Sequence, residues 1–387
     1  MALVALNVAL SPLSVALMVL TKKSHGSPQP AAVQRGFAIA IHGGAGTIRR
    51  ELMTPQLVAE YRDVLNHSTA AGETVLLAGG NALDAVVAAV KVMEESALFN
   101  AARGAVFTHD GINEMDAAVM DGRSSDDGGN ARGGGAVAGV THTRSPVECA
   151  KRVYTNSRHV LLANAGANQF CREEGLPEEP TSYFATERRW QQLQNSINST
   201  EAQLAQSKGR RRRLRETAEV ARPPLFSTTV NWGTDLSADS PAVNFDSDKH
   251  GTVGAVARDT HGHLAAATST GGTSNKRFGR IGDSPILGAG TWAKDSTCAI
   301  SGTGHGEIFI REAAASQVSA RMEFGGVGLG EAMMKTLATM EAMWPEAGGM
   351  VGIDATGTVQ FGYTSAGMYR GWRSENGSSG VMIWADE

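Results

Sequence analysis

The sequence predicts a protein of mixed α-helices and β-strands. Apolar runs typical of buried strands occur in both halves of the chain, and so do apolar residues at helical spacing. A polar segment at about 185–250 separates the two halves. These patterns indicate only mixed α and β structure. An αββα sandwich, in which two sheets pack face to face between helix layers, would accommodate them.

In the first half, residues 37–41 form an apolar run that predicts a buried strand, which ends at the sequence HGGAG at 42–46. Residues 80–95 carry apolar side chains at helical spacing, and Asn81 is well suited to begin this helix. The other elements expected here are a loop, two strands and a helix, at 98–107, 116–121, 135–140 and 147–155.

Strand patterns return at Thr252. Residues 252–257 and 264–269 are apolar runs joined by an Asp-Thr-His-Gly turn, which predicts a β-hairpin. Apolar residues from Leu329 to Trp344 share one face of a predicted helix that stops at Pro345. Further strands are expected at 298–301, 309–311, 350–353 and 359–363.

Composition excludes several classes of function. The formal net charge of −4 provides no reason to expect nucleic acid as a partner. Cys149, Cys171 and Cys298 are far apart and odd in number, so we expect neither a disulfide framework nor a metal-binding cluster. This cysteine usage is typical of a reducing compartment and predicts a cytoplasmic location. No histidine spacing indicates a catalytic transition metal.

Two segments stand apart from the predicted fold. Residues 2–20 are almost wholly apolar and precede Lys22-Lys23, so residues 1–35 are a signal peptide, a membrane anchor or an unstructured extension. In the first two cases the protein would be secretory or membrane-anchored. The polar segment contains four arginines at 210–213, which can mark nuclear import or nucleic-acid binding. Aromatic residues are not interleaved with them, which favours a flexible linker.

The chain resembles the plant-type L-asparaginases with isoaspartyl peptidase activity, over about 37–180 and 248–385. In the first half, the shared motifs are HGGAG at 42–46, LFNA at 98–101, MDA at 115–117 and MDG at 120–122. In the second half, they are GTVGAV at 251–256, TSTGG at 268–272, NK at 275–276, GRIGDSP at 279–285, GAG at 288–290 and GTGHGE at 302–307. The resemblance implies the αββα sandwich of N-terminal nucleophile hydrolases.

The resemblance also implies activation by cleavage of the bond between Gly251 and Thr252. An α-subunit at 36–251 and a β-subunit at 252–387 would result and would associate as (αβ)₂. Thr252 would be the nucleophile that forms an acyl-enzyme, and its freed α-amine, with a reference pKa of about 8, would be the general base. The implied substrates are L-asparagine and β-aspartyl dipeptides, and the chemistry would require no cofactor.

Arg280 and Asp283 make chemical sense as a clamp for an amino acid. A guanidinium can bind the substrate's α-carboxylate through two hydrogen bonds, and a carboxylate can bind its α-ammonium. By resemblance, five more residues complete the site: Thr270 would hold the Thr252 terminus, Thr303 and Gly304 would form the oxyanion hole, Gly306 would bind the ammonium, and Asn100 would orient the nucleophile's region.

A loop in this family binds a structural sodium ion through backbone carbonyls, and carbonyl oxygens suit such a hard cation. The resemblance maps these ligands onto Met93, Glu94, Ser96, Phe99, Ala101 and Arg103.

The chain departs from the family pattern at several places. Ala102 replaces a glycine at a position where the backbone can require a positive φ. His305 stands in the oxyanion loop, where its imidazole could narrow the pocket or change its charge, and the loop at 123–134 is longer than usual. These departures bear on substrate preference and on the efficiency of maturation.

Other functions remain open at this stage. A glycosylasparaginase would share the nucleophile and the clamp, and a taspase-type endopeptidase would share the core. The HGGAG motif and the pairing of Arg280 with Asp283 favour an asparaginase with a small zwitterionic substrate. The non-enzymatic alternative is an uncleaved precursor that acts as a binding scaffold.

Overall fold

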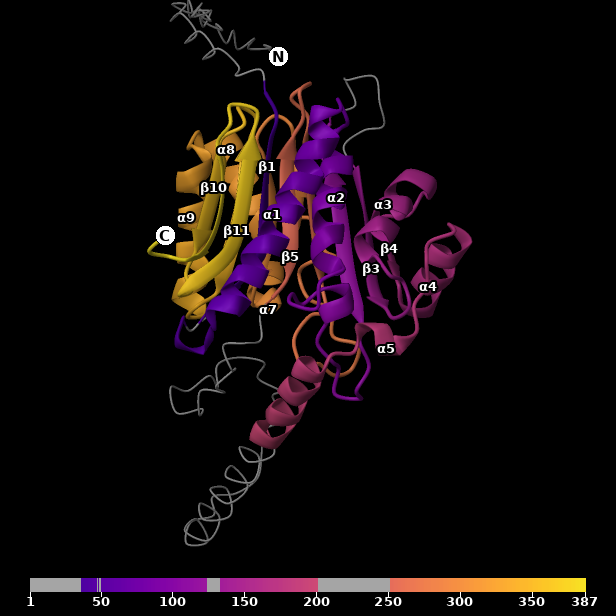
Figure 1. Cartoon of the computed structure of the whole chain (residues 1–387). Helices are drawn as coiled ribbons and strands as arrows, with labels where there is room; N and C mark the ends of the chain where they lie inside the picture. The colour runs from indigo at the N-terminus through magenta and orange to yellow at the C-terminus, as the bar shows by residue number, and fades with distance from the viewer. Residues whose placement is uncertain (1–35, 47, 49, 124–132, 201–250) are drawn as a thin grey trace, which may run out of the picture. The chain divides into compact units, whose positions relative to one another are not determined.

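Two β-sheets lie face to face in the computed structural model, and helices cover both outer sides (Figure 1). The structure describes residues 36–46, 48, 50–123, 133–200 and 251–387. Within these residues, the larger sheet has eight strands in the order β12-β11-β1-β5-β6-β2-β3-β4, and the smaller has four in the order β10-β9-β8-β7. The predicted αββα sandwich is therefore confirmed.

The elements have the following bounds. The strands are β1 Ala38–Gly46, β2 Met115–Asp121, β3 Gly133–Val140, β4 Leu161–Ala163, β5 Val253–Arg258, β6 Leu264–Thr270, β7 Thr291–Ala293, β8 Cys298–Gly304, β9 Gly348–Asp354, β10 Val359–Tyr363, β11 Gly367–Ser374 and β12 Ser379–Trp384. The helices are α1 Pro55–Leu77, α2 Ala82–Glu94, α3 Pro146–Asn156, α4 Asn164–Glu173, α5 Thr181–Phe184, α7 Gly306–Arg311, α8 Ala314–Gly325 and α9 Leu329–Met343, with short 3₁₀ turns at Arg50–Leu52 and Ala102–Gly104.

Helices α1, α2 and α3 pack on the outer face of the larger sheet and form the largest hydrophobic core. Helix α2 begins where the sequence predicted, because the Asn81 side chain accepts a hydrogen bond from the Asp84 N–H. Its buried face carries Val86, Val90 and Met93. Helices α8 and α9 cover the smaller sheet in the same way, with Met333 and Leu337 in a second core.

Small side chains fill the layer between the two sheets. Ala40 and Ala266 of the larger sheet and Ala299 of the smaller sheet are buried there. Short side chains let two sheets approach closely, and long buried residues such as Ile353 fill the remaining space. The inner strands of both sheets thus form a rigid base for the loops at their ends.

Antiparallel pairing brings three distant segments to one end of the larger sheet. His42 of β1 lies opposite Gly254 of β5, and Val253 of β5 lies opposite Ser269 of β6. Thr252, which directly precedes β5, is therefore close to the end of β6 although 18 residues separate Thr252 and Thr270. The loop that follows β6 begins at this end.

Three expectations about secondary structure were wrong or incomplete. Residues 309–311, expected as a strand, belong to helix α7. Helix α1 and strands β11 and β12 were not predicted. Residues 187–200 of the expected linker are helical, with Leu193 buried.

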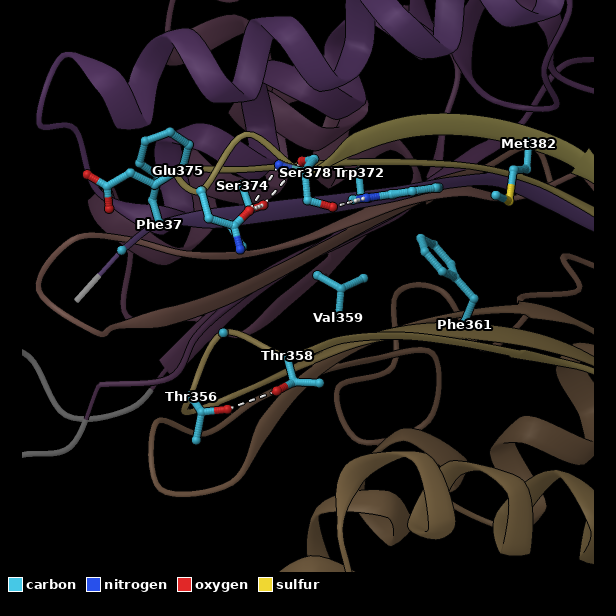
Figure 2. Close-up of a pocket in the computed structure, with 14 residues that line it drawn as sticks. Phe37, Thr356, Thr358, Val359, Phe361, Trp372, Ser374, Glu375, Ser378 and Met382 are labelled. Carbon is cyan, nitrogen blue, oxygen red and sulfur yellow. Dashed lines mark hydrogen bonds between the residues drawn. The ribbon is translucent and has the colours of Figure 1, made fainter. Parts of the chain in front are cut away.

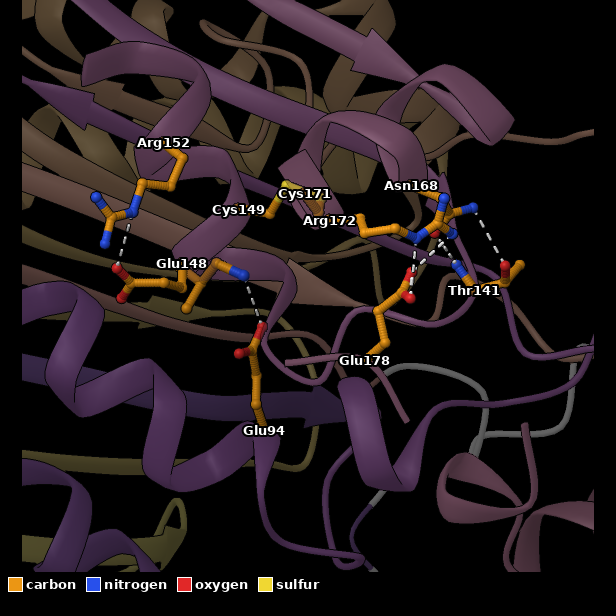
Figure 3. Close-up of a disulfide and its surroundings, with 10 residues drawn as sticks. Glu94, Thr141, Glu148, Cys149, Arg152, Asn168, Cys171, Arg172 and Glu178 are labelled. Carbon is orange, nitrogen blue, oxygen red and sulfur yellow. Dashed lines mark hydrogen bonds and ion pairs between the residues drawn. A yellow bond between two sulfur atoms is a disulfide. The ribbon is translucent and has the colours of Figure 1, made fainter. Parts of the chain in front are cut away.

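The expectation about cysteines was also wrong. Cys149 of α3 and Cys171 of α4 form a disulfide, and both are buried (Figure 3). The sequence could not reveal this pair, because 22 residues separate the cysteines and only the packing of two helices brings them together. The disulfide removes the argument from cysteine usage for a reducing compartment. Cys298 is a buried free thiol.

A pocket of about 810 Å³ opens between the two sheets at the end remote from Thr252 (Figure 2). Val359 and Phe361 of β10 point into it, and Trp372 of β11 lies along its opposite wall. Its lining includes none of the residues predicted for catalysis. No helix in the described part of the chain is long and apolar enough to cross a membrane.

Candidate active site

A small pocket at the start of β5 brings together most of the residues predicted for catalysis. Thr252 lies in it and is buried, with 7% of the residue exposed. The loop after β6 supplies one wall and the end of β8 supplies another. The lining residues are Thr252, Thr270, Gly272, Thr273, Arg280, Gly282, Asp283, Ser284 and Gly304.

The Thr252 hydroxyl donates a hydrogen bond to Thr270 Oγ1 at 3.1 Å. Thr270 Oγ1 also accepts the Gly272 N–H at 3.0 Å, which fixes its position. The Thr270 hydroxyl therefore orients the Thr252 side chain from the neighbouring strand.

Asp283 and Arg280 lie on the same loop, one buried and one partly exposed. Asp283 is 4% exposed, and burial raises the pKa of its carboxyl to about 7 although Arg280 lowers it. Asp283 Oδ2 is buried without a hydrogen-bond partner among the described residues, and a Cβ atom at Gly290 would lie 2.6 Å from it. The Arg280 guanidinium forms an ion pair with Glu307.

Gly306 lies between the side chains of Arg280 and Asp283. A Cβ atom at Gly306 would lie 2.8 Å from Arg280 Nη2 and 3.0 Å from Asp283 Oδ1. A larger residue at this position would therefore displace Arg280 or Asp283. Gly306 is not among the residues that line the pocket, but it packs directly against two of them.

Asn100 connects Gly251 to the loop after β6. Its backbone N–H donates to the Gly251 carbonyl at 3.2 Å, and its side-chain Nδ2 donates to the Gly272 carbonyl at 2.7 Å. Asn100 Oδ1 accepts the Val106 N–H at 2.9 Å. The residue is thus held on several sides and contacts both Gly251 and the wall of the pocket.

Thr303 and Gly304 end strand β8 beside the pocket. Gly304 lines it, whereas Thr303 is fully buried behind it, with Oγ1 accepting the Ala45 N–H at 3.4 Å. His305, expected to alter the substrate pocket, is not among its lining residues, and its ring lies 4.9 Å from the Trp344 ring.

Two charged residues beneath the pocket were missed as site residues. Asp116 of β2 lies opposite Thr270 and is fully buried, and burial raises the pKa of its carboxyl against the opposing effect of Lys276. The Lys276 ammonium donates to the Glu114 carbonyl at 2.8 Å. A charged residue inside an otherwise apolar strand was the signal for Asp116, because such a residue is rarely buried without a partner.

His42 was named only as part of a motif, yet it lies directly behind Thr252. Its Nε2 is 2.9 Å from Ser301 Oγ. Burial lowers the pKa of His42 to about 3, and a hydrogen bond with the Thr252 backbone opposes this effect. The imidazole is therefore neutral at physiological pH and connects the two sheets behind Thr252.

The predicted sodium loop follows helix α2. A Cβ atom at Gly104 would lie 2.0 Å from the Phe99 carbonyl oxygen and 2.9 Å from that of Ala97, so these oxygens converge on one point. The Ala101 carbonyl accepts the Gly104 N–H, and the Met93 carbonyl accepts the N–H groups of Glu95 and Ser96. This donor type fits a hard cation. In the described residues, no cluster of His, Cys, Asp or Glu side chains could hold a metal ion.

Ala102 lies in this loop with φ at 42°, so the position does adopt the left-handed conformation. The alanine is completely buried, and its Cβ costs about 1 kcal/mol or more relative to a glycine in that conformation. The expectation that this position needs a positive φ is confirmed.

Comparison with known proteins identifies the family. A sequence model described as Asparaginase matches residues 35–383. The chain is 40% identical over 334 residues to the isoaspartyl peptidase of Salmonella typhimurium, covering 86% of this chain and 94% of that protein. It is 37% identical to the plant-type L-asparaginase of Pyrococcus furiosus (84% and 92%) and 34% identical to the isoaspartyl peptidase/L-asparaginase of Danio rerio (85% and 90%). The chain belongs to this asparaginase family, whose fold is the N-terminal nucleophile hydrolase sandwich.

Proposed function

We propose that the chain is an autoprocessed hydrolase of the side-chain amide of L-asparagine and of the β-amide of β-aspartyl dipeptides. The names of its relatives, isoaspartyl peptidase and plant-type L-asparaginase, support this substrate class. One observation carries the proposal: Thr252, Arg280 and Asp283 line the same pocket.

Substrate recognition uses the charge of an amino acid. Arg280 binds the α-carboxylate through paired N–H donors, and the ionised Asp283 carboxylate accepts the α-ammonium. Both groups belong to the aspartyl part that the two substrates share. The small volume around Asp283 favours a short side chain that reaches Thr252 with its amide carbon.

Chemistry begins at the Thr252 hydroxyl. After cleavage of the preceding peptide bond, the α-amine of Thr252 is the nearest base and takes the hydroxyl proton as Oγ1 attacks the amide carbon. The resulting α-ammonium gives this proton to the leaving nitrogen, the carbon–nitrogen bond breaks, and ammonia or an amino acid departs. Water then attacks the resulting aspartyl ester and releases aspartate.

Negative charge develops on the amide oxygen during the attack. The Thr303 hydroxyl and the Gly304 N–H are our candidates for the oxyanion hole. Thr303 Oγ1 accepts a hydrogen bond from Ala45, so its own proton is free to be donated in the reaction. Loss of one such donor typically raises the barrier by about 3 kcal/mol.

The Thr252 hydroxyl would also perform the processing step, in which the chain is cleaved after Gly251. The Gly251 carbonyl oxygen accepts the Asn100 N–H at 3.2 Å, and this donor can stabilise the charge that forms when Thr252 attacks that carbonyl. The attack converts the peptide bond into an ester, which water hydrolyses. A sodium ion held by the carbonyls of the loop after α2 would keep Asn100 in place, and the mature subunits would assemble as (αβ)₂.

Intact mass and activity test the proposal together. The wild-type chain, incubated at neutral pH, is expected to yield a fragment of residues 252–387 and to release ammonia from L-asparagine. Thr252→Ala is expected to remain full length and inactive, whereas Thr297→Val, which removes a buried hydroxyl elsewhere, should still be cleaved. A cleaved and active Thr252→Ala protein would refute the proposal. An uncleaved, inactive wild-type chain would support the binding-scaffold alternative.

A further inference from the structure

The Arg280 guanidinium has one edge occupied by a protein carboxylate. Its Nε donates to Glu307 Oε1 and its Nη2 donates to Glu307 Oε2, both at 3.0 Å. A guanidinium has five N–H donors in one plane, and this contact uses two of them. One Nη2 hydrogen and both Nη1 hydrogens remain, and they form a second edge that can bind another carboxylate through two parallel hydrogen bonds.

The second edge faces the pocket that contains Thr252. A Cβ atom at Gly272 would lie 3.3 Å from Arg280 Nη1, and one at Gly282 would lie 2.9 Å from it. Both glycines line that pocket. Arg280 Nη2 is similarly close to Gly306, beside Asp283. Glu307 therefore holds the outer edge of the guanidinium while the inner edge lies where a substrate carboxylate is needed.

Glu307 contributes little to the fold at this position. It is in the first turn of α7, and its side chain is 61% exposed, whereas that of Arg280 is 20% exposed. Ion pairs exposed to this degree add little to stability because water screens them. Arg280 nevertheless lowers the pKa of Glu307, which keeps this carboxyl ionised at neutral pH.

We propose that Glu307 is a positioning residue that orients Arg280 for the α-carboxylate of the substrate. The proposal rests on the function proposed above and adds a residue to its binding step. An unrestrained arginine loses rotamer freedom when it binds a ligand, which weakens binding by roughly two- to tenfold. Glu307 restrains Arg280 before the substrate arrives. The rotamer freedom of Arg280 is therefore lost when the protein folds and not when the substrate binds.

Glu307→Gln tests this role because glutamine keeps the size of the side chain but loses its charge. We expect KM for L-asparagine to rise about three- to tenfold while kcat stays within about twofold, since Glu307 does not touch the reacting atoms. The inhibition constant of the product L-aspartate, which carries the same carboxylate, should rise by the same factor. Glu307→Ala should give an equal or larger effect.

Glu323→Gln is the matched control, because Glu323 of α8 forms an ion pair with Lys294, and neither residue lines the pocket. It should change neither constant. In an Arg280→Ala background, Glu307→Gln should have no further effect on KM, because the group that it orients is gone. Intact mass establishes that each variant is cleaved at Gly251.

The outcomes separate the two proposals. A wild-type protein that is cleaved but inactive on L-asparagine and β-aspartyl dipeptides would overturn the proposed function, and the role of Glu307 with it. An active wild type with an unchanged KM in Glu307→Gln would overturn only the role of Glu307. A lower KM would also overturn it, because Glu307 would then compete with the substrate for Arg280.

Discussion

The hydroxyl groups of Thr252 and Thr270 form a direct hydrogen bond across neighbouring strands, with Thr252 as the donor. Thr270→Val keeps the shape of the side chain but removes the acceptor for both Thr252 and the Gly272 N–H. We expect kcat for L-asparagine to fall about 10- to 100-fold, because the nucleophile loses its orientation. Steady-state kinetics of the cleaved enzyme measures this.

Two variants control for this prediction. Thr270→Ser retains the hydroxyl and should keep kcat within about fivefold of wild type. Thr297→Val removes another buried hydroxyl, which bonds to Ser319 at 2.7 Å at the opposite end of β8 from Gly304, and should leave kcat unchanged. A kcat for Thr270→Val within twofold of wild type would contradict the orienting role.

The pKa of Asp283, which burial raises to about 7, predicts a loss of substrate affinity in acid. Protonation neutralises the carboxylate that pairs with the substrate's ammonium, so binding weakens as pH falls. Below pH 7 we expect kcat/KM to fall towards tenfold per pH unit. The value of kcat should depend less on Asp283, because the bound ammonium lowers its pKa.

Binding of L-aspartate measures the effect of Asp283 without the chemical step. The α-amine of Thr252 acts in that chemical step. Calorimetry near pH 7, in buffers with different ionisation enthalpies, should detect proton release when L-aspartate binds, because Asp283 must ionise. In Asp283→Asn the residual binding should lose this proton release. Binding without proton release in wild type would show that Asp283 is already ionised in the free enzyme.

The predictable parts of the fold were those encoded in local patterns. Asn81 marked the start of α2, and the turn between β5 and β6 marked their hairpin. Residues 309–311 were assigned wrongly because three apolar-rich residues are too few to distinguish a strand from a helix. Their packing against α8, which decides the outcome, depends on a segment later in the chain.

The candidate site also has parts that the sequence predicts and parts that only the structure reveals. Thr252, Arg280 and Asp283 were predictable because their side chains have matching chemistry and lie in recognisable motifs. The contact of Arg280 with Glu307 spans 27 residues, and that of Glu94 with Ser269 spans 175. Neither spacing follows a helix or strand period, so only the folded structure reveals these pairs.

The hydrogen bonds of Glu94 predict that Glu94→Gln and Glu94→Ala differ strongly in the free energy of unfolding. Its Oε1 accepts from Ser269 Oγ at 2.6 Å and from the Val147 N–H at 3.0 Å, and its Oε2 accepts from Ser145 Oγ. Glu94→Gln can satisfy all three groups, because its amide oxygen accepts two bonds and its NH₂ can donate to Ser145. We expect a loss of less than about 1 kcal/mol in the free energy of unfolding.

Glu94→Ala leaves a cavity and buried groups without partners, and should cost about 3–5 kcal/mol. Urea denaturation of Thr252→Ala variants, which remain single chains under the proposed mechanism, measures both effects. The neighbouring Glu95 is exposed, so Glu95→Ala should change the free energy of unfolding by less than about 0.5 kcal/mol. Equal losses in Glu94→Gln and Glu94→Ala would contradict the hydrogen-bonding account.

The disulfide between Cys149 and Cys171 predicts a defined thiol count and a defined loss of stability. Denatured, unreduced protein should expose one thiol, that of Cys298, and reduction should raise the count to three. The double substitution of Cys149 and Cys171 by serine should lower the free energy of unfolding by about 3 kcal/mol, because the unfolded chain regains the freedom of a 22-residue loop. Cys298→Ser, which breaks no covalent bond, is the control for loss of a buried sulfur. Three reactive thiols in the unreduced protein would show that α3 and α4 are held by packing alone.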